Sequence, residues 1–432
     1  MSDLSVDKVL IQSERGDEPA MQGTAHSVLV LRGVLLALVL LALSGPVSAL
    51  FNVPGARWAF ACGALVPLIR GFTHLDPVRV QRGMRYLPVT LAEVCPQALA
   101  TVAAWPVAVW VGNYAAVLWL MIGQSVATVV FSHLLARRRY ELSFDRQSLR
   151  ILTAFALPLV ANGLLLFAAN QGDRAIVGAA YSMDVLGVYA VAAVLIGTPG
   201  FILAKTATAL GLPILARVQG SPGPFLTRYS LCIEALCLIA AAVAVPLIVG
   251  GDRLVTLVYG HQYSGAQAYV AWLGAMYAVW ALRIGPTLAA MSRGDTVNAV
   301  VANIARACAL VGVIGATAMG AGLEWVVIWG LAGEGAALLV STRRLRRVHG
   351  VPQVLTWQPA SLVGIAIGAA LLASPVGIGN GSAWEVGIAV IVLEACVCAA
   401  AAGLCPALRG EVIRAFRWSR DRAGIVVGTQ AS

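Results

Sequence analysis

Hydrophobic residues occur along this chain in blocks long enough to cross a lipid bilayer. Mostly apolar runs of about 18–25 residues alternate with short polar segments, and about 20 residues of helix span a hydrocarbon core of ~30 Å. The second block is short, and Arg57 interrupts it. The pattern predicts an all-α polytopic membrane protein of about twelve transmembrane helices, at residues 27–50, 53–70, 87–110, 113–136, 151–171, 184–210, 229–250, 266–290, 298–320, 322–342, 360–377 and 384–405.

The polar segments between these blocks divide into a basic set and a set with few charges. The basic set holds 23 Lys and Arg residues and comprises 1–26, 70–86, 137–150, 217–228, 291–297, 343–349 and 406–432. The opposite set holds only Arg174 and Arg253. Because basic loops remain on the cytoplasmic side, we expect both termini in the cytoplasm.

Composition excludes a soluble protein and changes the meaning of the net charge. Hydrophobic residues make up 59% of the chain and charged residues only 12%, with a mean hydropathy of +0.83. Too few polar residues remain to cover a soluble core. The net charge of +10 would point to nucleic acid in a soluble protein, but here the basic residues flank hydrophobic blocks. We therefore expect membrane lipids as partners and no nucleic acid.

No motif in the sequence indicates an enzyme, a metal site or a cofactor. The polar segments are too short for a soluble catalytic domain, and no GxxxxGK[ST] phosphate-binding loop occurs. The eight cysteines form no CxxC pair, and the five histidines lie at predicted helix ends or in loops. We interpret the cysteines as small buried apolar residues and the histidines as scattered interfacial groups.

Ionisable residues inside the predicted helices are the candidate functional groups. A charge within the bilayer costs a few kcal/mol, so it usually faces a partner or a water-filled cavity. Several cations fall in the cytoplasmic half, which suits an anionic ligand loaded from the cytoplasm. The charged residues inside predicted helices are Arg32, Glu93, Lys205, Glu234, Arg283, Arg306, Glu334 and Glu394.

Each of these charges also has a purely structural interpretation. A long side chain such as that of Arg306 can reach the lipid headgroups and serve only as an anchor. Lys205 and Arg283 lie deeper, on helices that contain proline, and are stronger candidates for a site. Glu334 follows two glycines that permit close helix approach. An interhelical pair and an ion-coupling site are equally consistent with its position.

Three stretches of the sequence resemble a known transporter family. The segment 155–178 carries a Leu-Pro near its start and the run Asn170-Gln-Gly-Asp-Arg174, and Leu186-Gly-Val-Tyr189 follows. This pattern resembles the seventh and eighth helices of Wzx-type flippases, polysaccharide transporters of the multidrug/oligosaccharidyl-lipid/polysaccharide superfamily. Segments 53–86 and 252–260 resemble the family's fourth helix with its basic loop and one of its outer loops.

The resemblance implies a flippase of the bacterial cytoplasmic membrane, and no enzyme. Its substrate would be an undecaprenyl-diphosphate-linked oligosaccharide for cell-surface polysaccharide synthesis, moved by alternating access and driven by a gradient of Na⁺ or H⁺. The cations would meet the diphosphate or acidic sugars, and the acids would serve coupling or structure. The candidate cations are Lys205, Arg283, Arg174 and Arg306, and the candidate acids are Asp173 and Glu334.

The resemblance also predicts the division of the chain. Family members have twelve or fourteen helices in two six-helix lobes, the MATE-like fold, and this chain aligns without the first helix pair. Either the start codon is placed too late or the protein is a shortened member. The expected parts are a cytoplasmic segment 1–26, a shortened N-terminal lobe 27–136, a C-terminal lobe 151–342, an appended helix pair 360–405 and a basic cytoplasmic tail 406–432.

Two other functions are consistent with the sequence. A drug or cation antiporter of the same superfamily would favour acidic residues in its cavity, whereas this chain's candidates lean basic in the cytoplasmic half. A non-transporting scaffold of a polysaccharide-assembly complex would explain the missing helix pair.

Overall fold

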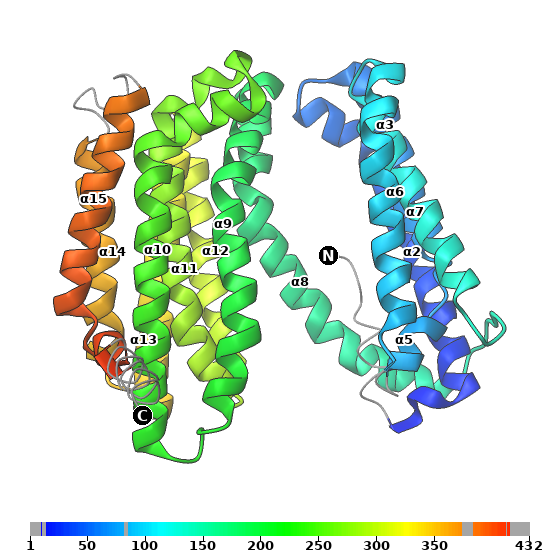
Figure 1. Ribbon diagram of the computed structural model, residues 1–432. Coiled ribbons are helices and arrows are strands. Elements are labelled where there is room, and N and C mark those ends of the chain that lie inside the picture. The colour runs from blue at the N-terminus through cyan, green and yellow to red at the C-terminus, as the bar shows by residue number, and fades with distance from the viewer. Residues whose placement is uncertain (1–9, 11–13, 82–84, 374–382, 412, 415–432) are drawn as a thin grey trace, which may run out of the picture. The chain divides into compact units, whose positions relative to one another are not determined.

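The chain forms long helices throughout its described part, as the computed structural model shows (Figure 1). The structure describes residues 10, 14–81, 85–373, 383–411 and 413–414. Nine helices in this part are long and apolar enough to cross a membrane: α2, α6, α7, α9, α10, α12, α13, α14 and α15. The prediction of an all-α, multi-pass membrane protein is confirmed.

The chain divides into two units, one of residues 1–164 and one of residues 165–432. Helix α8 (Arg146–Ala180) begins in the first unit and ends in the second. It is therefore the covalent link between them.

Unit 1 is built around α2 and the antiparallel pair α6 and α7. Its helices are α2 (Pro19–Leu50), α3 (Arg57–Gly63), α4 (Leu65–Arg70), α5 (Asp76–Val80), α6 (Leu87–Val111) and α7 (Ala115–Leu134). Helix α2 packs against α3 and α4, and α4 packs against α7. Gly33 allows the close approach of α2 and α4, because a Cβ atom there would lie 2.7 Å from the Pro67 carbonyl oxygen.

Unit 2 contains a bundle in which α10 and α11 are central. Its helices are α9 (Met183–Ala216), α10 (Pro222–Tyr259), α11 (Gln267–Ser292), α12 (Val297–Ala318), α13 (Leu323–His349), α14 (Val354–Ala373) and α15 (Ala383–Leu404). Helix α11 packs against α9, α10, α13 and α14, and α12 packs against α13. Buried alanines and valines supply much of the bundle's interior, which lets the helices pack closely.

Helix ends differ from the sequence prediction at several places. Helix α2 begins at Pro19 instead of residue 27, and α8 covers Arg146–Ala180 instead of 151–171. Helix α10 continues to Tyr259, so much of the stretch between the predicted helices 229–250 and 266–290 is helical. Most of the predicted tail 406–432 and part of the segment 1–26 lie outside the described residues.

The predicted helix 53–70 is not one continuous span. The structure has a 3₁₀ turn at Pro54–Ala56, then α3 and α4, separated at Ala64. The expectation of a single short helix was therefore wrong. The prolines Pro54 and Pro67 explain part of the break, because proline lacks the N–H that a continuous helix requires.

Candidate functional site

A buried carboxylate pairs with two arginines inside unit 2. Glu334 lies on α13 with its side chain only 1% exposed. Its Oε2 lies 3.0 Å from Nε of Arg283 on α11, and its Oε1 lies 2.6 Å from Nε of Arg306 on α12. Three helices therefore bring one acid and two bases together in a single ion-pair group.

Two asparagines complete this group, which we call the buried network: Arg283, Arg306, Glu334, Asn170 and Asn303. Arg283 Nη1 donates to Asn303 Oδ1 at 3.2 Å, and Arg306 Nη1 donates to Asn170 Oδ1 at 2.6 Å. The asparagines are neutral, so two guanidinium charges face one carboxylate. The buried network therefore carries a net charge of +1.

Close helix packing places the network's charges within reach of one another. A Cβ atom on Gly333 would lie 2.6 Å from the Ala309 Cβ and 3.1 Å from the carbonyl oxygen of Arg306. Only a residue without a side chain lets α12 and α13 approach this closely. The glycine beside Glu334 thus positions Arg306 against it.

The structure bears on the two interpretations of Arg306, as a site residue or only as an anchor. Its side chain pairs with Glu334 and is 16% exposed, so Arg306 does not serve only as an anchor. Arg283 is likewise buried, with its side chain 9% exposed. The role of these residues in binding a substrate stays a prediction.

Asp173 and Arg174 lie inside α8 and not beyond the end of the predicted helix 151–171, because α8 continues to Ala180. The Tyr189 hydroxyl donates to Asp173 Oδ2 at 2.6 Å, and Arg174 Nη1 donates to Gln171 Oε1 at 3.1 Å. Asp173 Oδ1 and Arg174 Nε are buried without a hydrogen-bond partner among the described residues. Both groups therefore retain unused hydrogen-bonding capacity.

Tyr277 on α11 is near enough to both groups for their charges to act on its hydroxyl. The charges are those of Asp173, Arg174, Arg306 and Glu334. The structure thus brings five of the six predicted site residues into one polar region of unit 2.

Lys205 is the candidate that the structure leaves apart. It lies on α9 with an exposed side chain, and no hydrogen bond or ion pair of its side chain occurs within the described residues. No hydrogen bond or ion pair among the described residues therefore supports the predicted role of Lys205 in substrate binding.

Three histidines that the sequence interpretation treated as scattered groups lie together in unit 1. The ring centroids of His26 and His74 are 4.9 Å apart, and those of His74 and His133 are 5.2 Å apart. The interpretation of these histidines as separate interfacial groups was wrong. The signal was their position: each of the three lies in or next to a predicted cytoplasmic segment, 1–26, 70–86 or 137–150.

No group of three or more potential metal ligands occurs in the part of the chain that the structure describes. All eight cysteines are free thiols. Only Cys237 and Cys405 are buried in the apolar core, so the interpretation as buried residues holds for two of the eight.

The sequence matches the family model described as "Polysaccharide biosynthesis protein" over residues 1–268. The chain belongs to this family. This match confirms the family resemblance drawn from the motif of segment 155–178. No curated protein matches significantly.

Comparison with solved structures gives one match that establishes the fold. The structure titled "Lipid II flippase MurJ, inward closed conformation" is similar with a TM-score of 0.68 and 10% identity, covering 91% of this chain and 86% of that chain. A second match is titled "Outward-facing conformation of a multidrug resistance MATE family transporter of the MOP superfamily", with a TM-score of 0.44, 14% identity, and coverage of 85% and 82%. At these identities, the first similarity establishes a shared fold.

Proposed function

We propose that this protein is a flippase that moves an undecaprenyl-diphosphate-linked oligosaccharide across the bacterial cytoplasmic membrane. The buried network carries the proposal, because it places an excess positive charge inside a helical bundle of a polysaccharide-biosynthesis transporter family. A buried charge of this kind is expensive and usually serves a function. A diphosphate offers the opposite charge and an oxygen geometry that suits guanidinium groups.

The substrate would share the arginines with Glu334. In the resting state, Glu334 neutralises one of the two guanidinium charges and holds both side chains in place. An arriving diphosphate would compete for the same N–H donors, and the second arginine supplies the attraction. Asp173 and Arg174 have unpaired buried atoms nearby, which suit contacts with the substrate or a coupling ion.

The proposed transport cycle is alternating access driven by Na⁺ or H⁺, with both termini in the cytoplasm. The similarity to a lipid II flippase supports a lipid-linked substrate, and the basic loops support the orientation. The candidate binding residues are mainly cationic, and this disfavours an exporter of organic cations.

The test is complementation of a strain that lacks its own oligosaccharide flippase. We expect the wild-type chain to restore surface polysaccharide, and Arg283→Gln and Arg306→Gln to reduce it at least tenfold at equal membrane levels. Arg217→Gln is the matched control, because Arg217 is an exposed arginine at the end of α9. Arg306→Lys keeps the charge but loses the planar fork, so we expect partial activity.

Full activity of both arginine variants would remove the basis of the cationic site. Wild-type protein that reaches the membrane but never complements, while polysaccharide assembly still depends on its presence, would support the scaffold function instead.

A further inference from the structure

A pocket lies in unit 1 between the first two turns of α2 and the segment 135–145, which connects α7 to α8. Pro19, Gln22, Gly23 and His26 line the pocket from α2, and their spacing of three and four residues places them on one face of that helix. Its volume is about 270 Å³. That is close to the lower end of ligand pockets, ~300 Å³, so the pocket can hold a small polar group.

Hydrogen bonds fix the connecting segment along α2. The Ser143 N–H donates to the Gly23 carbonyl oxygen at 3.3 Å, and Ser27 Oγ donates to the Ser143 carbonyl oxygen at 2.8 Å. The Asp145 N–H donates to Thr24 Oγ1 at 3.0 Å. Both walls of the pocket are therefore joined by bonds between segments that are distant in the sequence.

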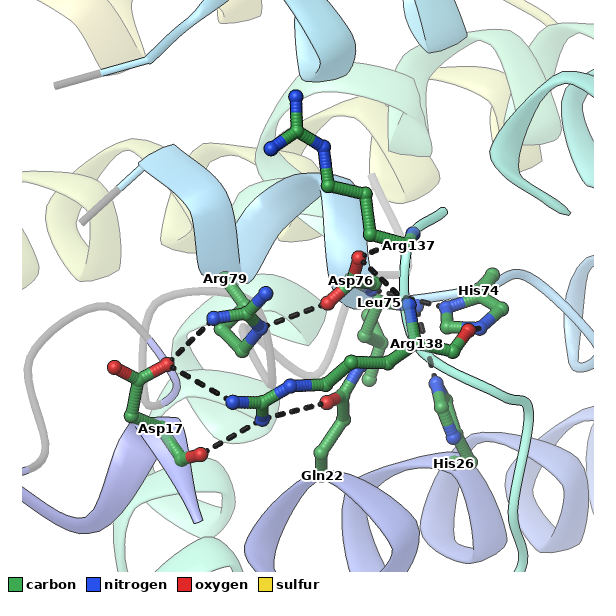
Figure 2. Close-up of polar contacts among 9 residues, drawn as sticks. All are labelled: Asp17, Gln22, His26, His74, Leu75, Asp76, Arg79, Arg137 and Arg138. Carbon is green, nitrogen blue, oxygen red and sulfur yellow. Dashed lines mark hydrogen bonds and ion pairs between the residues drawn. The ribbon is translucent and has the colours of Figure 1, made fainter. Parts of the chain in front are cut away.

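Arg138 is held at the pocket by contacts that leave part of its guanidinium group unused. Its Nη1 donates to the Asp17 carbonyl oxygen at 2.7 Å and to Gln22 Oε1 at 3.4 Å, and its Nη2 lies 3.7 Å from Asp17 Oδ1. Figure 2 shows this guanidinium group beside Asp17 and Gln22. A guanidinium group has five N–H donors, which is more than these contacts use.

Gln22 supplies a buried donor without an acceptor. Its side chain lines the pocket, and the residue is only 3% exposed. The amide oxygen accepts from Arg138, whereas Nε2 is buried and has no hydrogen-bond partner among the described residues. Buried polar groups nearly always have a partner, so this amide group calls for an acceptor that the protein does not provide.

The other lining side chains leave the pocket short of acceptors. Arg139 is exposed, and its side chain makes no hydrogen bond or ion pair within the part of the chain that the structure describes. The imidazole of His26 already contacts the Leu75 N–H and the Glu141 carbonyl oxygen. Glu141 is the one acid that lines the pocket among the described residues, and it is exposed, so water screens its charge. The unused donors therefore suit an anion.

The connecting segment also carries apolar side chains that point to a lipid as the source of this anion. Leu142 is 55% exposed and Phe144 is 70% exposed, both close in sequence to the basic residues of the pocket. The segments 1–26 and 137–150 belong to the basic set that we expect on the cytoplasmic side. The cytoplasmic leaflet carries anionic lipids, and basic pockets on that side bind their headgroups.

We propose that this pocket is a headgroup site for an anionic phospholipid. The phosphate oxygens accept hydrogen bonds from Arg138 and Arg139, whose planar guanidinium groups match phosphate geometry, and from Gln22 Nε2. The acyl chains run past Leu142 and Phe144. None of these residues belongs to the buried network, so the lipid is a bound partner and not the transported substrate, and the site does not rest on the proposed function.

The test measures lipid binding to the full-length protein in a neutral detergent by native mass spectrometry. Phosphatidylglycerol and zwitterionic phosphatidylcholine with the same acyl chains are titrated in parallel. We expect the wild type to bind its first phosphatidylglycerol molecule about tenfold or more tightly than phosphatidylcholine, because two basic residues act on the phosphate. Inorganic phosphate, which lacks acyl chains, should displace this lipid only weakly.

Two arginine variants separate the site from general attraction. Arg139→Gln should weaken phosphatidylglycerol binding about fivefold, the effect of one basic residue near an anionic headgroup. Arg137→Gln is the matched control: it removes the same charge from the same segment, but Arg137 does not line the pocket, and Figure 2 shows its guanidinium group pointing away from that of Arg138. Arg137→Gln should bind the lipid as the wild type does. Both arginines are exposed, so neither change should alter Tm.

Two further variants change the charge of the pocket in opposite directions. Glu141→Gln removes the acid that lines the pocket and should strengthen phosphatidylglycerol binding. Gln22→Glu keeps the shape of the side chain and gives Arg138 an ion-pair partner, but places a carboxylate where the phosphate would bind. This variant should lose the preference for phosphatidylglycerol.

Three results would overturn the headgroup site. The first is equal affinity of the wild type for phosphatidylglycerol and phosphatidylcholine. The second is an equal loss of affinity in Arg137→Gln and Arg139→Gln, which would show attraction by the net charge alone. The third is binding of inorganic phosphate as tight as that of phosphatidylglycerol, which would assign the pocket to a soluble phosphate compound. The readout is binding, so none of these results depends on transport.

Discussion

Glu334 is the residue whose neutralisation should disturb the buried network most. The substitution Glu334→Gln keeps the shape of the side chain but leaves the guanidinium groups of Arg283 and Arg306 without a counter-charge. Their ion-pair distances to Glu334 are 3.0 Å and 2.6 Å, and the Glu334 side chain is 1% exposed. Solvent therefore cannot replace the lost partner.

The expected loss follows from this burial. Removing one partner of a buried ion pair costs about 3–5 kcal/mol. In domains of this general size each kcal/mol lowers Tm by about 2–4 °C. With a loss of about 3 kcal/mol, the lower end of this range, we expect Glu334→Gln to lower the Tm of the detergent-solubilised protein by about 6–12 °C.

A double-mutant cycle separates charge balance from simple packing damage. In Glu334→Gln/Arg306→Gln the network has the same net charge as in the wild type, so part of the lost stability should return, with a coupling of about 0.5–3 kcal/mol. Transport should not return, because the proposed anion-binding arginine is gone.

Glu394→Gln is the matched control for this experiment. Glu394 lies in the membrane-spanning helix α15, and its buried Oε1 has no hydrogen-bond partner within the described residues. Neutralising it should leave Tm unchanged or raise it. Equal Tm values for wild type and Glu334→Gln, or a double variant less stable than the sum of the single losses, would refute the charge-balance argument.

Three further substitutions test other parts of the structure. Gly333→Ala should push α12 from α13, because the new methyl group would meet backbone and Cβ atoms, and should lower both Tm and complementation. Tyr189→Phe should cost about 1–3 kcal/mol in thermal unfolding, since Asp173 loses its hydroxyl donor. Asp295→Asn should destabilise at neutral pH, and by less as pH falls below about 3.9: burial opposes ionisation, yet the two hydrogen bonds from Arg344, both 3.0 Å, lower the pKa of Asp295. Its contribution is therefore present above the unfolded value of about 3.9 and lost as pH falls through the folded pKa.

The lengths of the hydrophobic blocks predict most of the membrane helices, because the thickness of the bilayer sets how long an apolar helix must be. The predicted helix 87–110 matches α6 (Leu87–Val111) within a residue. The prediction is poorer where a helix extends beyond the apolar block, as in α2. Its first turns contain buried polar residues such as Thr24, whose hydroxyl accepts from the distant Asp145 N–H. Hydropathy cannot detect such extensions, because their partners come from distant parts of the chain.

The candidate site also depends on partners from distant parts of the chain, which the sequence alone does not predict. Sequence position indicates that Arg283, Arg306 and Glu334 are costly in a membrane, but not that they share one group. Their pairing depends on which faces of α11, α12 and α13 meet, and Gly333 decides part of that. The cluster of His26, His74 and His133 was missed because these rings bond to backbone atoms, and backbone partners leave no trace in residue types.

The most direct test of the proposed function is transport by the purified protein. Wild-type protein and Arg306→Gln would be reconstituted in liposomes that contain an undecaprenyl-diphosphate-linked oligosaccharide, and the fraction of glycan reaching the opposite leaflet would be measured under an imposed ion gradient. We predict gradient-dependent flipping by the wild type and a loss of at least tenfold in Arg306→Gln, with both proteins folded. Absence of flipping by folded wild-type protein, together with efflux of organic cations under the same gradient, would contradict the account.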